Sequence, residues 1–254
     1  MKTVKKALAV LDTFTGDVRG QGVTEIANKL EIHKSTAHGL LTTLKDGGYV
    51  ILDRETRKYF LGYKVLELAG RIHHQRDLRD VSRPVMEQLS KTIEEDVALN
   101  IAIEGRRICT ALVESQYFVR NLIPVGKALP LHCSAAGKVL LAYMEKGQIE
   151  ALVRRHGLPR FTQNTITQKE KLFAELAEIR ERGYGESREE YGKEAASVAF
   201  PLFDVTGKVV GSLSIQSTVT RLNSKTRPKF IKEGVRAAEK ISSLVVGSSQ
   251  PYKI

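Results

Sequence analysis

The sequence lacks the features that mark a secreted, membrane-embedded or metal-centred protein. It has only two cysteines, Cys109 and Cys133, and their separation is not that of metal ligands, so neither a disulfide framework nor a zinc site is expected. No apolar run approaches the length of a membrane span, and the N-terminal residues do not resemble a signal peptide. These absences favour a reduced cytoplasmic setting without membrane association.

The composition allows two folded domains, and the excess of positive charge favours a polyanionic partner. With 254 residues and 42% hydrophobic content, the chain can form two separate cores. Its net charge is +11, of which residues 1–76 carry +5 and the remaining 178 residues carry +6. A solvated surface explains the second figure well. The denser charge of the first segment is better explained by nucleic-acid binding, because it gathers on the elements described next.

Residues 23–62 have the order of a DNA-reading motif, with two short amphipathic helices, a tight turn and a basic hairpin. In the first helix Thr24 is the expected N-cap, and Ile26, Ala27 and Leu30 share an apolar face. In the second helix apolar residues recur at i, i+3, i+4 and i+7, which buries one side and exposes the other. Polar side chains that can reach phosphates and base edges in a major groove are Thr24, Lys34, Ser35, Thr36, His38, Thr42 and Thr43.

The segments around these helices complete a winged helix-turn-helix over residues 1–62. An earlier helix is expected to begin near Lys2 or Thr3, and the glycine pair at residues 47–48 ends the second reading helix. Residues 49–52 and 58–61 read as strands on either side of a turn. This two-stranded wing presents three cations that can lie along a phosphate backbone, namely Arg54, Arg57 and Lys58. A connector helix is expected over residues 63–76.

The rest of the chain, residues 77–254, predicts an α+β domain. Helices are expected near residues 79–94, 134–143, 145–155, 168–182 and 224–246, and strands near residues 97–104, 107–114, 184, 197–203 and 209–217. Such a mainly antiparallel sheet with flanking helices commonly encloses a small ligand against one of its faces. We therefore expect a ligand-binding domain in this half of the chain.

No set of residues assembles into a catalytic or cofactor site. The Gly137-Lys138 pair lacks the upstream glycine and the following Ser or Thr of a phosphate loop. Ser134 and Lys138 lie one helical turn apart, yet a serine N-cap and a surface lysine explain that spacing better than a nucleophile and its base. The glutamates at residues 186, 189 and 190 fit a solvated loop, and His132-Cys133 has no third orienting group. No enzyme, no metal and no cofactor is expected.

The sequence resembles the IclR family of bacterial transcription regulators across nearly its whole length. The motifs KSTAHGLLTTLKDGGYV, LPLHCSAAGKVLLAYM, GYGESREEYGKEAASVAFPLFD and VVGSLSIQS carry this resemblance. It implies a regulator that binds double-stranded operator DNA as a homodimer or homotetramer, with a small-molecule effector in a GAF-like C-terminal domain. The effector positions that it implies are Ala135, Ala136, Ser187, Ser197, Ser214 and Gln216.

Three positions depart from the usual pattern of this family. Ser187 and Ser197 stand where an aspartate and a cysteine are common, so the pocket is less negative and tolerates an anionic ligand more readily. Gly39 stands where a larger and often basic side chain is common, which costs the reading helix about 1 kcal/mol relative to alanine. The expected function is a repressor controlled by a small organic acid. The alternatives are an enzyme that uses Ser134, Ser197 and the loop at residues 189–190, or a nonspecific architectural DNA binder.

Overall fold

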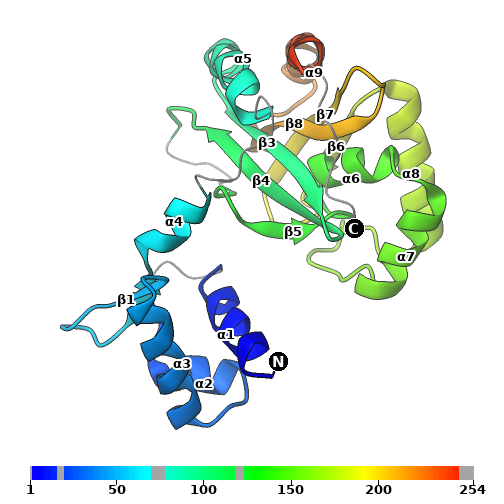
Figure 1. The fold of residues 1–254 in the computed structure, drawn as a ribbon. Helices are drawn as coiled ribbons and strands as arrows, with labels where there is room; N and C mark the ends of the chain where they lie inside the picture. Colours follow the sequence, from blue (N-terminus) through cyan, green and yellow to red (C-terminus); the bar gives the residue numbers. More distant parts are fainter. Residues whose placement is uncertain (1, 16–19, 70–77, 118–122, 246–254) are drawn as a thin grey trace. The chain divides into compact units, whose positions relative to one another are not determined.

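The protein folds into two compact units, which we describe separately. The computed structural model describes residues 2–15, 20–69, 78–117 and 123–245, and it divides the chain into Met1–His73 and His74–Ile254 (Figure 1). The connector helix α4 is present over Tyr63–Ala69. The expected remainder of the connector and the boundary near residues 73–74 lie outside the described residues.

The N-terminal unit is a winged helix-turn-helix, as the sequence predicts. Its elements are α1 (Lys2–Asp12), a 3-10 turn (Thr13–Thr15), α2 (Val23–Lys29), α3 (Lys34–Asp46), β1 (Val50–Leu52) and β2 (Tyr59–Leu61). The predicted apolar residues of α3 are all buried, and its three leucines pack in one core with Val10, Ile26 and Tyr59. Strands β1 and β2 pair in antiparallel register. Both strands contribute side chains to this same core, which anchors the wing.

Two helix ends show how local chemistry sets the boundaries of the reading helices. The prediction that Thr24 is an N-cap is wrong, since α2 begins at Val23 and its cap is Gly22. The Glu25 carboxylate accepts the Gly22 N–H at 2.6 Å, so the helix start is satisfied without a capping hydroxyl. The predicted C-terminal end of α3 is confirmed. Helix α3 stops at Asp46 because Gly47 caps it and Gly48 follows at φ +74°, a conformation that glycine adopts without strain.

The C-terminal unit is built on a six-stranded antiparallel sheet in the order β5-β4-β3-β8-β7-β6. The strands are β3 (Asp96–Ile103), β4 (Arg106–Val113), β5 (Ala128–Pro130), β6 (Gly185–Arg188), β7 (Ala195–Phe203) and β8 (Val209–Thr218). The helices are α5 (Leu78–Ile93), α6 (Ala135–Ala142), α7 (Lys146–His156), α8 (Lys169–Arg182) and α9 (Arg227–Leu244). The sequence predicts all of these except β5, whose three residues are too few to show an alternating pattern.

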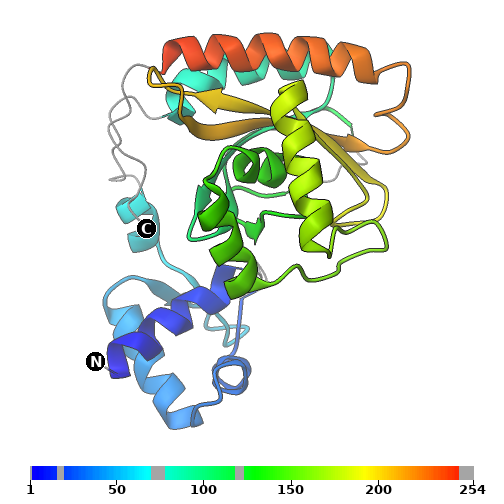
Figure 2. The ribbon, with the colours of Figure 1, turned by 90° about the vertical axis from the view of Figure 1, so that its right-hand side faces the viewer.

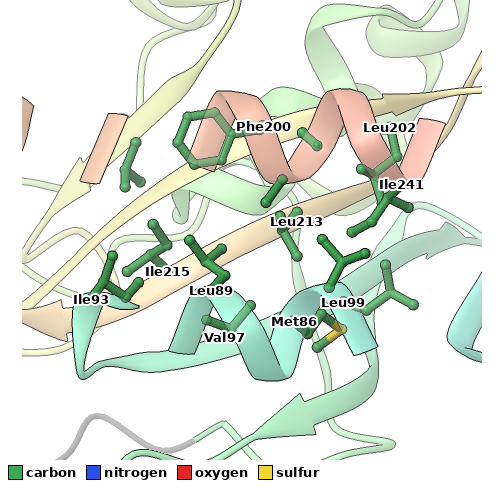
Figure 3. Close-up of a cluster of buried hydrophobic side chains, with 14 of the residues drawn as sticks. Met86, Leu89, Ile93, Val97, Leu99, Phe200, Leu202, Leu213, Ile215 and Ile241 are labelled. Carbon is green, nitrogen blue, oxygen red and sulfur yellow. The ribbon is translucent and has the colours of Figure 1, made fainter. Parts of the chain in front are cut away.

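The two faces of this sheet are covered by different helices. Helices α5 and α9 pack side by side on one face and enclose an apolar core, which includes Leu99, Leu213 and Ile215 (Figure 3). Helix α6 lies on the other face, with α8 outside it (Figure 2). None of the described helices is both long and apolar enough to cross a membrane.

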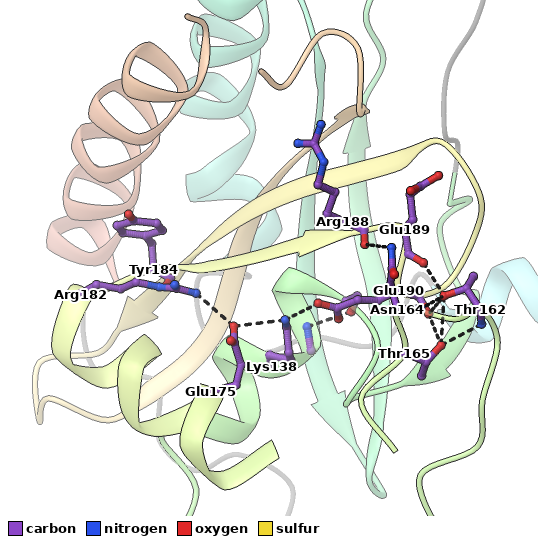
Figure 4. A network of polar contacts seen from close by, with 12 residues as sticks. Lys138, Thr162, Asn164, Thr165, Glu175, Arg182, Tyr184, Arg188, Glu189 and Glu190 are labelled. Carbon is purple, nitrogen blue, oxygen red and sulfur yellow. Dashed lines mark hydrogen bonds and ion pairs between the residues drawn. The ribbon is translucent and has the colours of Figure 1, made fainter. Parts of the chain in front are cut away.

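A buried ion-pair network ties α6 and α8 to the loop that follows β6. The Lys138 ammonium on α6 is only 2% exposed, and it lies 2.5 Å from the Glu190 carboxylate and 3.2 Å from that of Glu175 (Figure 4). The Thr165 hydroxyl donates to the Glu190 carbonyl at 2.6 Å. Burial raises the pKa of the Glu190 carboxyl, and the Lys138 charge offsets part of that rise. The loop is therefore held through the Glu190 side chain and through the backbone carbonyl of the same residue.

This network corrects two predictions about charged residues. Lys138 is not a surface lysine, because helix α6 is buried on every side and the ammonium has carboxylate partners inside the domain. The glutamates of this region do not form one solvated cluster either. Glu186 pairs with Arg227 at 2.7 Å and Glu190 is buried. Glu189 is half-buried, and its carboxylate accepts the Glu194 N–H at 2.9 Å.

We predict that Lys138→Met lowers the free energy of unfolding by about 3 kcal/mol, because it leaves the Glu190 carboxylate buried without its counter-charge. Urea denaturation measures this loss. The double variant Lys138→Met/Glu190→Gln removes both charges and should recover at least half of it. A single variant as stable as the wild type would show that the pair contributes nothing to folding.

Candidate nucleic-acid interface and ligand pocket

Helix α3 presents a polar face to solvent, opposite its buried apolar stripe. Lys34, Ser35, His38 and Thr43 are exposed, and Thr36 and Thr42 are half-buried. Thr24 is exposed on α2, apart from the capping role expected of it. All the polar side chains that the sequence singles out on the two helices are thus accessible to a partner.

The geometry of α3 limits what two of these residues can donate. The hydroxyl of Thr42 donates to the His38 carbonyl at 2.9 Å, and that of Thr43 donates to the Gly39 carbonyl at 3.1 Å. In this state both hydroxyls offer a partner their oxygen as an acceptor. A Cβ added at Gly39 would meet no atom within 4 Å, so the glycine is not required by packing and its open surface leaves room for a partner.

The wing is a rigid turn with exposed cations at its tip. The Asp53 carboxylate accepts the backbone N–H of Glu55 at 2.8 Å and that of Thr56 at 3.3 Å, and these hydrogen bonds lower the pKa of its carboxyl. Arg54 and Arg57 are exposed, and neither forms an ion pair with another described residue. Together with the half-buried Lys58, they offer unneutralised positive charge on a fixed loop. Such a loop suits phosphate contacts, which set position rather than sequence preference.

The C-terminal unit holds a pocket on the sheet face that α6 covers. Residues from β4 through β8 and from the start of α6 line it: Arg107, Ile123, Leu129, Cys133, Ser134, Ala136, Ser187, Tyr191, Ala195, Ala196, Ser197, Ser214 and Gln216. Five of the six effector positions implied by the family resemblance are among them. The sixth, Ala135, is fully buried beside them at the first residue of α6.

Strand register explains why residues so distant in sequence meet in this pocket. Ser187 pairs with Ser197, and Ser197 pairs with Gln216, so the three side chains form a row across β6, β7 and β8. Ser214 lies two residues before Gln216 and therefore faces the same side of the sheet. The alternation of polar and apolar residues in β8 thus separates the pocket wall from the apolar core.

Arg107 supplies the charge of the pocket, although it is not among the site residues predicted from the sequence. Its side chain is only 2% exposed, and its Nη1 donates to the Asn100 side-chain oxygen at 2.7 Å. Asn100 in turn donates to the Ser214 hydroxyl at 3.0 Å, so the guanidinium is fixed from behind. The other two nitrogens, Nε and Nη2, have no hydrogen-bond partner among the residues that the structure describes. Burial lowers the pKa of this guanidinium.

The other polar groups in and around the pocket are neutral. Gln216 is 4% exposed, and within the described part of the chain neither its amide nitrogen nor its amide oxygen has a hydrogen-bond partner. Burial raises the pKa of the Cys109 thiol and raises that of Cys133 to about 12, so both cysteines are neutral thiols near pH 7. The pocket therefore combines one cation with unpartnered amide groups, an arrangement that binds a ligand more readily than it attacks one.

The arrangement of the candidate nucleophiles does not form a catalytic site. The Ser134 oxygen accepts the Gly137 N–H at 3.1 Å, which confirms its predicted role as the cap of α6. Lys138 is engaged by carboxylates, and His132 lies 3.0 Å from the Pro159 carbonyl. Across the described ranges, no group of three or more His, Cys, Asp or Glu side chains has the geometry of a metal site.

Arg107 and Tyr191 line the pocket, but reasoning from the sequence did not select them. A usable signal lay in strand alternation, because residues two apart share a face: Arg107 lies on the same side of β4 as Cys109 and Ala111, and all three are buried. An arginine at an inward position of a strand needs a partner, and its neighbours on β4 and β3 are not acidic. No comparable signal marks Tyr191, whose place depends on the buried anchorage of the preceding glutamate.

Comparisons with known proteins agree with both units. Residues 3–54 match the IclR helix-turn-helix domain, and residues 70–243 match the bacterial transcriptional regulator IclR C-terminal domain. The chain is 31% identical over 252 residues to the HTH-type transcriptional regulator KdgR of Escherichia coli (strain K12), covering 99% of this chain and 95% of that protein. It is 28% identical over 233 residues to the HTH-type transcriptional repressor AllR of the same strain, covering 92% and 85%.

Solved structures show the same architecture. An IclR transcriptional regulator from Alicyclobacillus acidocaldarius superposes with a TM-score of 0.83 at 27% identity, covering 96% of this chain and 98% of that one. An IclR homologue from Microbacterium hydrocarbonoxydans, solved in complex with 4-hydroxybenzoate, superposes with a TM-score of 0.82 at 26% identity, covering 95% and 98%. The chain thus belongs to the IclR family and is a DNA-binding transcriptional regulator with an effector-binding C-terminal domain, not an enzyme.

Proposed function

We propose that this regulator is a repressor whose affinity for its operator is controlled by a small organic acid bound in the C-terminal pocket. The observation that carries the proposal is a buried pocket with one fixed cation and an unpartnered amide, in the same chain as an exposed reading helix. Two relatives support it. AllR is named a repressor, and the Microbacterium homologue was solved with the carboxylic acid 4-hydroxybenzoate.

In this proposal the two units have separate tasks. Helix α3 reads bases in the major groove through Ser35, Thr36, His38 and Thr42, while Lys34, Arg54, Arg57 and Lys58 contact phosphates. The pocket binds the effector through Arg107, Ser187, Ser197, Ser214 and Gln216, with the first turn of α6 at Ala135 and Ala136 adding backbone N–H groups. Effector binding changes how the C-terminal domains hold the connector helices, and therefore the spacing of the two reading helices.

The working form that we propose is a homodimer or homotetramer in the cytoplasm. A two-fold protein reads two half-sites that lie one helical turn apart or a multiple of it, so dimerisation is needed for spacing to act as a switch. Exposed apolar side chains are available for such contacts, since Val4 and Leu8 on α1 are 65% and 57% exposed and Leu66 on α4 is 69% exposed. Sedimentation equilibrium gives the oligomeric state, and a monomer at the concentration that binds DNA would contradict it.

We predict different effects for changes at the wing and at the reading helix. Arg57→Ala should weaken binding to every DNA sequence and lower the slope of log affinity against log salt by about one, because it removes one phosphate contact. Thr36→Ala should leave that slope unchanged and relax sequence preference at one base pair by about 1–3 kcal/mol. Fluorescence anisotropy with operator variants at several salt concentrations measures both.

A matched control is Arg155→Ala, which removes the same charge from an exposed position on α7 of the C-terminal unit. It should leave the salt slope at its wild-type value. If Thr36→Ala lowers the salt slope and Arg57→Ala alters sequence preference, the roles assigned to helix and wing are reversed. Equal affinity for the region upstream of the gene and for random DNA at fixed salt would instead favour a nonspecific architectural protein.

Effector control predicts that the right small acid weakens operator binding by about 5- to 150-fold, the usual range for coupling between two sites. A gel-shift titration against a library of small carboxylic acids measures this change. Ligands for the library are first chosen by thermal shift of the full chain. Operator affinity that is indifferent to every ligand that binds the protein would exclude the switch.

A further inference from the structure

The strongest unexplained feature of the pocket is the bare edge of the Arg107 guanidinium, the edge that has no hydrogen-bond partner among the described residues. Arginine stays protonated in proteins, so this side chain, which is only 2% exposed, is a permanent buried cation. It forms no ion pair with any described acidic residue, and the ionisable groups that act on its charge are Cys109, Cys133 and Tyr191. A buried charge without a counter-charge destabilises the fold, and a bound anion would offset that cost.

The unsatisfied nitrogens are the two that face the same way. In a guanidinium, Nε–H and the adjacent Nη2–H form one edge, and two parallel hydrogen bonds from such an edge match the two oxygens of a carboxylate. Asn100 occupies Nη1 at 2.7 Å and is itself held by the Ser214 hydroxyl at 3.0 Å. The guanidinium is thus already oriented before a ligand binds, and its Nε–Nη2 edge belongs to a residue that lines the pocket.

A second pair of unpartnered groups lies in the same pocket. The Gln216 amide offers one acceptor and an NH₂ donor, both buried and both without a hydrogen-bond partner in the described ranges. A hydroxyl group on a ligand can donate to the oxygen or accept from the nitrogen, and so matches either half of the amide. Among the described residues that line the pocket, Arg107 is the only charged one, so the pocket neutralises one carboxylate and no more.

We infer that Arg107 determines the charge specificity of this pocket: its Nε–Nη2 edge binds the carboxylate of a small monocarboxylic acid that also carries a hydroxyl group, which Gln216 binds. The inference rests on the proposed function, since it names the chemical class of the effector. It assigns the carboxylate to the arginine on β4, whereas the first turn of α6 remains close enough to line the pocket through Ala136.

Matched small ligands test the charge. The full-length protein is titrated with propionate, with the neutral propionamide and with lactate, and thermal shift and calorimetry report binding. Propionate should stabilise the wild type more than propionamide does, and Arg107→Met should weaken propionate binding by about 100-fold while leaving propionamide binding unchanged. Arg106→Met is the matched control, because this neighbouring arginine is exposed and does not line the pocket, and it should behave as wild type.

Two further readouts keep the test decisive. Without ligand, Arg107→Met should melt at a higher temperature than the wild type, because it replaces an unpaired buried cation with an apolar side chain of similar size. Lactate should bind more tightly than propionate to the wild type, and Gln216→Leu should abolish that difference. An equal response of the wild type to propionate and propionamide, including no response to either, overturns the inference, as does a lower melting temperature of Arg107→Met.

These outcomes are distinct from those that test the proposed function. Charge-selective binding that leaves operator affinity unchanged would exclude the switch and retain the role of Arg107. A neutral ligand that releases the operator as well as an acid does would retain the switch and exclude that role.

Discussion

The constraint on which the C-terminal unit depends is that a strand directs successive side chains to opposite faces of its sheet. In β8, Leu213 and Ile215 enter the apolar core under α5 and α9, so Ser214 and Gln216 must face α6. The register of β6, β7 and β8 then aligns these groups with Ser187 and Ser197. The apolar face provides the stability of the fold, and the polar face that results is the ligand pocket.

Two buried cations beside this sheet face differ in whether their charge is paired within the fold. Lys138 has carboxylate partners within hydrogen-bond distance and holds the loop after β6 in place. Arg107 has a single neutral partner, and two of its three guanidinium nitrogens have none among the described residues. Because an unpaired buried charge is costly, folds retain one where something else pairs with it. The Lys138 network also fixes the loop that carries Tyr191 to the pocket, so the structural charge supports the binding one.

Periodic features were predictable from the sequence, whereas features set by tertiary partners were not. The apolar stripe of α3, the glycine stop after it and the Ser134 cap each follow from a few adjacent residues, and the structure confirms them. The burial of Lys138 depends on Glu175 and Glu190, which are 37 and 52 positions away in the chain. Helical spacing alone therefore suggested a surface lysine. The family resemblance pointed to the serines of the pocket. It did not point to Arg107, whose significance appears only when its missing partners are known.

The central claim is that the pocket of this regulator binds an organic acid through the bare edge of Arg107. A crystal structure of the full chain with bound lactate tests it most directly. The account predicts one carboxylate oxygen about 2.7–2.9 Å from Nε and the other at the same distance from Nη2. A carboxylate seated instead on the N–H groups of Ala135 and Ala136, with the guanidinium edge still bare, would contradict it.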